Sequence, residues 1–583
     1  MSKKIVKTDA SKIREEEDKL AEKPKMAAGR ILALYAAVIL LVFPVYYRDY
    51  YFDIMEAKYV FYWVLSLVTI GICLLIGAGF AVRDRQKFGG RAVRRFFRNA
   101  VTGGREGSRT WLMLLVFWVC AGIATLCSDY LYESFWGNEG RYSGLFLITI
   151  YCVTTALLAG FGRFRRGFMD LFLLSSLFVA VFGITDFFQL DILGFRGAAA
   201  GIPELNHFIS SIGNVNNYTA FLALSIAVGM SFFGLEKRRG LSAWYFVLTV
   251  VFLTAQFTGQ SDNAFLSLAA TMALLPFALF RRKAGIVRYL MLLGTIFLTM
   301  RLAAFWYNTY QGATLDISGL VRLVGSSPLS VAVAAIFYAI AAVLSFRWKK
   351  DGAEGSLDPG ADRDLDGSAD AGLRKVVRAW KYLVIAALAL LVLVLIYTNF
   401  IADPDSLGDL AQYLVFNDAW GTDRGYCWRI GMESYLKQPF LHRLFGFGPD
   451  TYGILTWNFR SDSIKNLGVY YESAHNEFLQ YLVTIGPVGT AAYILFLAGA
   501  VRKMLRRQKE LPWLLAPAAA VLAYNIQAII NIGMPIVTPI MWAMIGIGLA
   551  GCRKDWKLDL PGKWFRRGKA SAAEPSASEG EKS

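Results

Sequence analysis

Long apolar runs alternate with short polar connections along most of the chain. About fourteen of these runs are long enough to cross a membrane, because a helix needs about 20 predominantly apolar residues to span the hydrocarbon core. They lie near residues 30–47, 59–82, 110–128, 143–162, 168–190, 217–235, 241–258, 264–280, 285–305, 329–346, 380–401, 476–501, 511–530 and 535–552. The pattern therefore predicts an all-α, polytopic membrane protein.

The connections between the runs differ in length and composition, and they divide the chain into five parts. We expect a cytoplasmic N-terminal segment at 1–29, a transmembrane bundle of about eleven helices at 30–401, one large extracytoplasmic loop at 402–475, C-terminal transmembrane helices at 476–552 and a partly disordered cytoplasmic tail at 553–583. The large loop is aromatic and partly amphipathic, with Gly and Pro clusters, which is typical of an ordered cap. Residues 351–372, rich in Gly and Asp, predict a flexible cytoplasmic loop.

The overall composition agrees with this class. Hydrophobic residues make up 56% of the chain, charged residues make up 18%, and the mean hydropathy is +0.42, which is far more apolar than a soluble domain of this length. No cleavable apolar segment follows directly behind Met1, so we expect the first apolar run to anchor the chain in place of a signal peptide.

Lys and Arg gather in alternate connections. If the N-terminus is cytoplasmic, the cytoplasmic connections hold most of the 61 Lys and Arg residues, as the positive-inside rule requires. Both termini are then expected on the cytoplasmic side. The formal net charge of +17 follows from this bias, so a nucleic-acid partner is not needed and a DNA- or RNA-binding role is disfavoured.

All three histidines fall on the outer side in this topology. A lone histidine is more often packed than catalytic, and we keep that interpretation for His207 and His442. His475 differs, because it is expected in the first turn of the helix at 476–501, with Ser473 as a plausible N-cap. The positive end of the helix dipole would lower its pKa, and the same end attracts phosphate. A neutral base beside phosphate suits attack by a hydroxyl on a sugar whose leaving group is a lipid pyrophosphate.

Such a leaving group needs positive charge, from a metal or from arginine, whose guanidinium can clamp phosphate oxygens. Arg424 and Arg429 lie in a predicted short helix near the outer surface, and Arg141 lies just before the fourth apolar run. Each could instead pair with a carboxylate, such as Asp418 or Asp423, or with a lipid head group.

The chain also carries a resemblance to a known family. His475 and Asn476, followed after nine residues by Gly486 and after two more by Gly489, resemble the H-N-x9-G-x-x-G signature of the bacterial O-antigen ligase and polysaccharide polymerase superfamily. Motifs in the preceding loop and in three upstream segments are similar to the family's in the same order. These are Arg424 with Trp428, Pro439, Gly446–Tyr452, Gly140–Leu145, Gly213–Tyr218 and Thr258–Ser261.

The resemblance implies a GT-C-like helical fold and a glycosyltransferase of the O-antigen ligase type. Members of the family transfer an oligosaccharide or polysaccharide from undecaprenyl pyrophosphate to an acceptor on the outer side of the bacterial cytoplasmic membrane. The acceptor is a lipid, a protein or another glycan. We expect an inverting transfer without metal or other cofactor, with membrane lipid around the protein.

The resemblance also implies roles for individual residues. His475 would be the general base or a positioning group, and Arg424 with Arg141 would bind pyrophosphate. Further substrate contacts are expected at Arg429, Asn476, Trp428 and Asn217, and no metal ligands are expected. The family often has arginine directly after the serine that matches Ser261, whereas Asp262 stands here, so a phosphate contact is not expected at that position.

Two other functions stay open. A polymerase, which passes the glycan to another carrier-linked repeat, needs the same base and leaving group as a ligase. A lipid-linked glycan transporter or flippase is also compatible with about fourteen helices. Transport predicts ionisable residues in the middle of the spans, and the central stretches contain few, so this alternative is less favoured.

Overall fold

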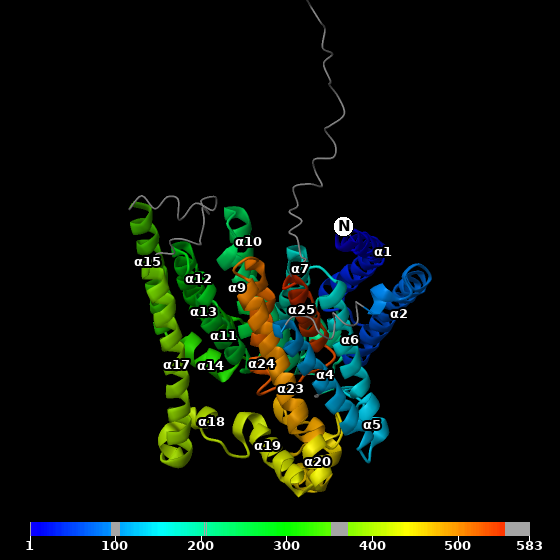
Figure 1. Ribbon diagram of the computed structural model, residues 1–583. Coiled ribbons are helices and arrows are strands. Elements are labelled where there is room, and N and C mark those ends of the chain that lie inside the picture. The colour runs from blue at the N-terminus through cyan, green and yellow to red at the C-terminus, as the bar shows by residue number, and fades with distance from the viewer. Residues whose placement is uncertain (1, 95–104, 203–204, 206, 351–370, 554–583) are drawn as a thin grey trace, which may run out of the picture.

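The computed structural model describes residues 2–94, 105–202, 205, 207–350 and 371–553, and most of them are helical (Figure 1). In this part of the chain one sheet is present, formed by the antiparallel two-residue strands β1 (Phe208–Ile209) and β2 (Gly213–Asn214). The all-α fold class is therefore confirmed. Residues 351–370 of the predicted flexible loop and residues 554–583 of the predicted tail lie outside the described residues.

Ten of the described helices are long and apolar enough to cross a membrane. They are α1 (Ser2–Ala37), which continues as the π-turn η1 (Val38–Val42), α2 (Ile54–Phe88), α4 (Arg105–Leu126), α7 (Arg166–Phe187), α9 (Val215–Leu235), α10 (Arg239–Phe257), α13 (Lys283–Thr309), α15 (Leu329–Lys350), α17 (Ala371–Phe400) and α23 (Glu477–Arg507). Shorter helices occupy the four remaining apolar runs. They are α6 (Leu145–Phe161), α11 (Asn263–Leu274) with α12 (Pro276–Leu279), α24 (Leu515–Gln527) and α25 (Thr538–Gly551). Every predicted run therefore corresponds to a helix.

The long helix α9 and the short helices α24 and α25 lie in the centre of the bundle, whereas several other long helices face outward. α9 packs against α24, and α25 packs against α6. In the most apolar window of α9, 94% of residues are buried, against 6% in α17. A helix that is apolar all round and buried all round belongs to the core, so α9, α24 and α25 form the inner layer. Gly546 lets α25 approach α6 closely, since a Cβ there would lie 2.7 Å from the Cβ of Leu158.

The long connection between α17 and α23 folds into short helices at the end of the bundle opposite the start of α1 (Figure 1). These are η4 (Pro404–Leu410), α18 (Ala411–Leu414), α19 (Trp420–Lys437), α20 (Phe440–Phe445), α21 (Tyr452–Leu455), η5 (Trp457–Phe459) and α22 (Arg460–Leu467). Their own small core, centred on Phe447 and Tyr452, joins them to the first turns of α23. We call this group of elements the cap.

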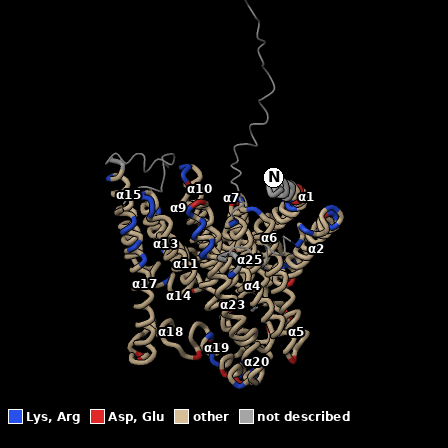
Figure 2. The backbone as a smooth tube through the Cα atoms, viewed as in Figure 1, with Lys and Arg blue, Asp and Glu red and all other residues tan. Residues whose placement is uncertain are grey.

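Charged residues are distributed unevenly between the two ends of the bundle. Figure 2 shows Lys and Arg at the upper ends of α2, α10 and α15, which is the end at which α1 begins. The opposite end, near α19 and α20, carries both signs of charge. This asymmetry is the one that the positive-inside rule describes.

Candidate functional site

A kink in α23 joins the cap to the membrane helices. Gly486 has φ +82°, and the next residue, Pro487, has no N–H to donate within the helix. The carbonyls of Val483 and Thr484 are therefore free to accept hydrogen bonds from the backbone N–H groups of segment 446–448, at 3.1 and 2.9 Å. The motif at Gly446–Tyr452 thus contacts the motif that contains Gly486 and Gly489.

The next residues of the cap hold a distant loop in place. One carboxylate oxygen of Asp450 accepts hydrogen bonds from the backbone N–H groups of Asn138, at 2.8 Å, and Ser143, at 3.0 Å. The side-chain amide of Asn138 donates in turn to the carbonyl of Asp450. This loop carries Arg141. Burial raises the pKa of Asp450 to about 6, although the nearby charge of Arg141 opposes that shift.

His475 lies just outside the helix, not in its first turn as the sequence suggested. α23 begins at Glu477, and Asn476 is its N-cap, with Oδ1 accepting the N–H groups of the second and third residues that follow, each at 3.0 Å. The prediction of Ser473 as the cap is therefore wrong, and its buried Oγ has no hydrogen-bond partner. His475 has φ +46°, a left-handed conformation that is uncommon outside glycine and is often found at functional sites.

The imidazole of His475 lies near two arginines that are far away in the sequence. Burial, together with the positive charges of Arg141 and Arg424, lowers the pKa of His475 from 6.5 to about 3. These causes replace the helix dipole that the sequence suggested. The ring of Tyr471 contacts the imidazole edge-on, with centroids 5.7 Å apart, and its hydroxyl donates to Asp423 at 3.0 Å.

Neither arginine forms an ion pair with a carboxylate of the described residues, although Asp450 acts electrostatically on Arg141 and Asp262 on Arg424. Arg424 donates through Nε to the carbonyl of Ile530 at 2.8 Å and through Nη1 to the carbonyl of Gly421. Arg141 makes no side-chain hydrogen bond within the described part of the chain, and its Nε is buried without a partner. Burial lowers the pKa of both guanidinium groups, because desolvation disfavours their charged form. An anion with several oxygens would satisfy both groups at once.

The loop between α24 and α25 connects three parts of this site. Within residues 528–531, one carbonyl accepts from Arg424, and two others accept from the backbone N–H of Glu477, both at 2.9 Å. The side chain of Asn531 donates to the carbonyl of Asn216 at 3.2 Å. Asn216 stands in the first turn of α9, so this loop ties α19, α9 and the start of α23 together.

Asp262 brings a carboxylate toward the arginines. Its pKa is raised by burial, while the charge of Arg424 acts in the opposite direction. Ser261, one residue earlier, donates to Oδ1 of Asn216 at 2.8 Å and so belongs to the same network. The departure from the family pattern at Asp262 therefore adds a negative charge close to the candidate anion site.

Arg429 and Trp428 project from α19 in other surroundings. Arg429 is half-exposed and pairs with both carboxylate oxygens of Asp418, at 2.8 and 2.7 Å. Trp428 lies one turn after Arg424 and packs with Phe416 and Trp420, with ring centroids 5.6 and 5.2 Å away. The indole N–H of Trp428 is buried without a partner.

The surroundings of the remaining candidate residues indicate mainly structural roles. Asn217 is buried in α9, and its neighbour Asn216 makes the hydrogen bonds described above. His442 packs against the ring of Phe447, with centroids 5.3 Å apart, which agrees with its interpretation as a packed side chain. Within the residues that the structure describes, no group of three or more His, Cys, Asp or Glu side chains could hold a metal ion.

Comparison with known proteins finds a family match for part of the chain. Residues 317–494 match the family model described as O-Antigen ligase. The matched stretch contains Arg424 and His475 and ends within α23, and it confirms the resemblance to the O-antigen ligase and polymerase superfamily. The match supports a membrane glycan-processing function at the level of that family, and the many apolar helices indicate a multi-pass membrane protein. Neither the curated proteins nor the solved structures gave a significant match.

The sequence did not point to several residues that build this site. Asp450 lies within a recognised motif, but its partners lie more than 300 positions away. Asn216 was part of an upstream motif, yet its neighbour Asn217 was selected because nothing in the sequence distinguishes the two amides. The loop at 528–531 carries no motif and acts through its backbone.

Proposed function

We propose that the protein is a membrane glycosyltransferase of the O-antigen ligase type. It transfers an oligosaccharide or polysaccharide from undecaprenyl pyrophosphate to an acceptor outside the bacterial cytoplasmic membrane, without a metal and with inversion. One observation carries the proposal most directly. The charges of Arg141 and Arg424, neither of them paired with a carboxylate within 4 Å among the described residues, both act on the imidazole of His475.

The orientation in the membrane follows from the charge asymmetry. The end at which α1 begins is rich in Lys and Arg, so we place it in the cytoplasm (Figure 2). Both termini are then cytoplasmic, and the cap, with His475, faces the outside. This is the side on which a finished lipid-linked glycan would meet its acceptor.

The two arginines would bind the pyrophosphate of the donor. Guanidinium groups hold phosphate oxygens through paired hydrogen bonds, and Arg424 is already oriented by the carbonyls of Gly421 and Ile530. The buried Nε of Arg141, which has no partner, would gain one. The negative charge that builds up on the leaving pyrophosphate is then stabilised in place.

His475 would accept the proton of the attacking hydroxyl. The acceptor oxygen forms a bond to the anomeric carbon while the bond from that carbon to the pyrophosphate oxygen breaks, and the electron pair leaves with the carrier pyrophosphate. The hydroxyl proton passes to the imidazole. A single displacement of this kind inverts the anomeric configuration.

The low pKa of His475 couples the base to the donor. With a pKa of about 3, the imidazole is neutral but a weak base in the free protein. Bound pyrophosphate would offset the charges of Arg141 and Arg424, which are two of the three causes of the low pKa. The pKa would then rise, so the base becomes effective only when the donor is present.

The aromatic rings beside Arg424 suit a sugar. Phe416 and Trp420 stack on each other, and Trp428, one helical turn after Arg424, lies tilted against both. The indole N–H of Trp428 lacks a partner among the described residues. We assign these rings to the glycan part of the donor. Arg429 would contribute only after leaving Asp418, and Asn476 would act mainly by capping α23 beside His475.

Product analysis with purified protein in lipid vesicles tests this proposal. Undecaprenyl pyrophosphate glycan is supplied with candidate acceptors, and mass spectrometry follows the bond that forms. A glycan attached to a non-carrier acceptor supports a ligase, and a lengthened carrier-linked glycan identifies a polymerase. Movement of the intact donor across the vesicle, without any new glycosidic bond, would contradict the enzymatic proposal and favour transport.

A further inference from the structure

A cavity of about 430 Å³ lies at the end of the bundle opposite the cap. It opens where the last turn of α9, the connection from α12 to α13, the first turns of α17 and the connection after α23 meet. Its size is in the range of small-molecule sites, about 300–1,000 Å³. Apolar and cationic side chains share its wall. Among them are Leu235, Leu279, Val377, Arg281, Arg374 and Lys509.

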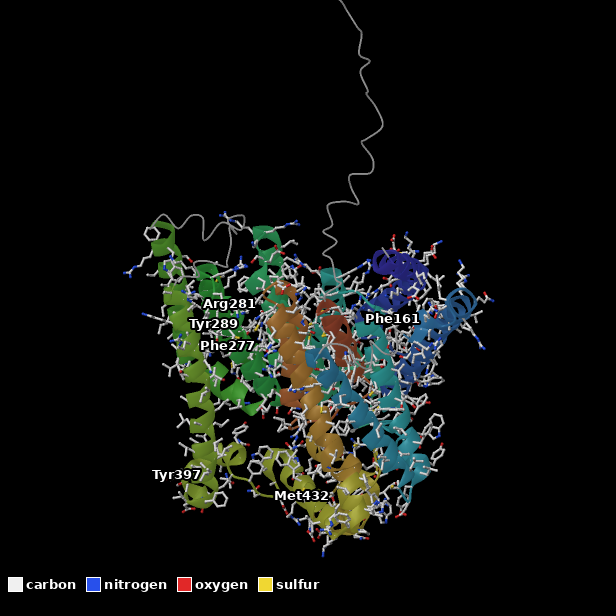
Figure 3. The ribbon with its side chains drawn as sticks, viewed as in Figure 1. Phe161, Phe277, Arg281, Tyr289, Tyr397 and Met432 are labelled. Carbon is white, nitrogen blue, oxygen red and sulfur yellow. The ribbon has the colours of Figure 1, made fainter. Side chains whose placement is uncertain are left out.

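The described side chains that line this cavity carry positive charge. Neither Asp nor Glu is found among its lining residues in the described part of the chain. Arg281, Arg374 and Lys509 make no side-chain hydrogen bond or ion pair with any residue that the structure describes. Figure 3 shows Arg281 on the side of Tyr289 that faces the end where α1 begins. Three cations converging without an anion are expected to attract one.

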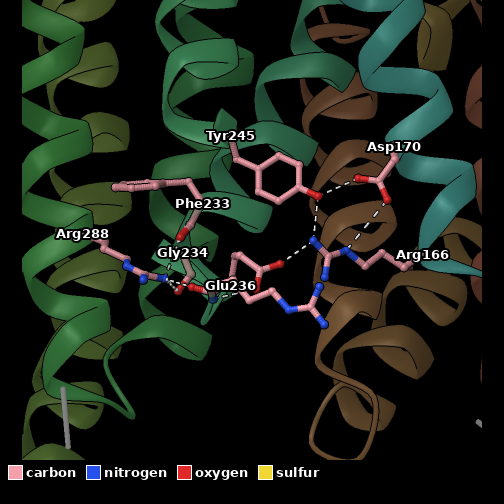
Figure 4. Close-up of polar contacts among 8 residues, drawn as sticks. Arg166, Asp170, Phe233, Gly234, Glu236, Tyr245 and Arg288 are labelled. Carbon is pink, nitrogen blue, oxygen red and sulfur yellow. Dashed lines mark hydrogen bonds and ion pairs between the residues drawn. The ribbon is translucent and has the colours of Figure 1, made fainter. Parts of the chain in front are cut away.

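Nearby carboxylates are already engaged elsewhere. Glu236, just after α9, accepts from Arg166 on α7 and from the backbone N–H of Arg238, the latter at 2.9 Å (Figure 4). Glu510, next to Lys509, pairs with Arg507. Neither of these two carboxylates, each next in sequence to a residue of the cavity wall, therefore neutralises the cavity.

Carbonyl groups at the C-terminal end of α9 are engaged by another arginine, Arg288, and not by these cations. Free carbonyls at a helix C-terminus bear partial negative charge. Nη1 of Arg288 donates to the carbonyls of Phe233, at 2.8 Å, and Glu236, at 2.6 Å (Figure 4). Arg288 therefore occupies two carbonyls at this helix end, and these two are not left to interact with the cations of the cavity.

The position of the cavity indicates where that anion comes from. α17 is almost entirely exposed along its apolar length, so it faces lipid. One of its residues, Trp380, attaches it to α11 by donating to the carbonyl of Ala273 at 3.0 Å. The cavity lies just before this attachment, at the level of Arg374, where a lipid head group could reach the cations while its acyl chains follow α17.

We propose that this cavity binds the phosphate ester of an anionic membrane lipid in the cytoplasmic leaflet. Basic pockets between membrane helices on the cytoplasmic side are suited to acidic head groups. Arg281, Arg374 and Lys509 hold the phosphate, and Val377 and Leu279 contact the first carbons of the chains. The proposal rests on the orientation given above but not on the transfer reaction. A soluble phosphate ester has the same anionic group, so the source of the phosphate is decided by experiment.

Native mass spectrometry of the full-length protein tests the site. The protein is taken from nanodiscs of phosphatidylcholine with a minor share of phosphatidylglycerol, and retained lipid is counted. Arg281→Gln/Arg374→Gln/Lys509→Gln should lower the apparent affinity for phosphatidylglycerol about 100-fold, since each cation near the surface contributes about a fivefold effect. High salt should weaken retention. Glycan transfer should be retained, because the cap is unchanged.

Matched variants make the result specific. Arg83→Gln/Arg85→Gln/Lys87→Gln removes three cations at the same end of the bundle, on α2, and should leave retention unchanged. Arg281→Lys/Arg374→Lys keeps the charges and should keep the lipid, which separates loss of binding from loss of folding. Equal loss in both triple variants, or no loss in the cavity variant, would overturn the proposal.

The source of the phosphate is resolved by competition. Glycerol phosphate and inorganic phosphate are added to the nanodisc-derived protein at increasing concentration. Retention of phosphatidylglycerol against both supports the lipid as occupant. Displacement of the lipid by either soluble anion at a comparable concentration would overturn the assignment to a membrane lipid and identify a soluble phosphate ester as the ligand.

Discussion

The carboxylate of Asp450 accepts a hydrogen bond from the backbone N–H of Ser143 at 3.0 Å, across 307 positions of sequence. The same oxygen accepts from Asn138, so one side chain of the cap fixes both ends of the loop that carries Arg141. The placement of this arginine beside His475 therefore depends on a carboxylate that has no need to touch a substrate.

Replacing Asp450 tests this dependence. Asp450→Ala should leave two partly buried N–H groups without an acceptor, which costs up to about 1–3 kcal/mol for each group. The looser loop should raise the KM for the donor more than it lowers kcat. Asp450→Asn keeps an acceptor oxygen and should be closer to wild type in stability. Steady-state kinetics and thermal unfolding in detergent measure both, and identical donor KM values for the two variants and the wild type would contradict the positioning role.

Substitution of Arg424 or Arg141 should lower the transfer activity more than substitution of Arg429. Arg424→Ala and Arg141→Ala should each lower kcat/KM about 10- to 100-fold, the effect of losing a charge-assisted hydrogen bond of about 1.5–3 kcal/mol. Lys at either position should recover part of the loss, because a point charge replaces only part of the planar fork. Arg429→Ala should cost least, since Arg429 is paired with Asp418. A larger loss for Arg429→Ala than for Arg424→Ala would contradict this order.

The kink at Gly486 should not tolerate a side chain. A Cβ at this position would lie 2.3 Å from the carbonyl oxygen of Leu444, and its φ is +82°. Gly468 provides a matched control, because its φ is +73° but a Cβ there would meet no atom within 4 Å. Gly468→Ala should cost about 1–2 kcal/mol from backbone strain alone. Gly486→Ala should lower the melting temperature clearly more and abolish transfer, and equal shifts would show that the contact with α20 is unimportant.

Donor binding should be linked to protonation of His475. The pKa of about 3 in the free protein means that the imidazole is neutral at pH 6–7. Bound pyrophosphate raises this pKa, so the protein should take up protons at pH values between about 3 and the raised pKa, and should bind the donor less tightly as the pH rises through that interval. Conversely, kcat should fall as the pH drops below the raised pKa, because the base must be neutral to act.

Calorimetry in buffers of different ionisation enthalpy measures this proton uptake. His475→Asn should reduce it while leaving donor binding intact. Asp450, whose own pKa is raised to about 6, is the second group expected to contribute, and Asp450→Asn measures its share of the proton uptake. Unchanged uptake in His475→Asn would mean that the donor does not approach the imidazole.

Hydrophobic run length was enough to locate the membrane helices. Each run at 30–47 through 535–552 became a helix, because burial in lipid or in the bundle core requires helical hydrogen bonding of the backbone. The runs could not show which helices are central. α24 and α25 are short and fully enclosed, and their place depends on small residues such as Gly546 that meet a partner only in the folded bundle.

The site was predicted in part, and its missed features have physical reasons. His475 and Arg424 were recognisable from motif spacing, but the N-cap was assigned to Ser473 because serine and asparagine cap helices about equally well. Arg424 and Arg429 could not be separated by composition, although five residues along a helix place them about 140° apart around its axis. That angle brings Arg424 to Ile530 and leaves Arg429 with Asp418.

Turnover of the donor by His475→Ala tests the central claim most directly. The purified variant in vesicles is compared with His442→Ala, which removes a packed histidine of the same cap. We predict that His475→Ala binds the lipid-linked donor but transfers glycan at least about 100-fold more slowly than the wild type. His442→Ala should retain transfer. Transfer by His475→Ala at the wild-type rate would contradict the assignment of a base flanked by Arg141 and Arg424.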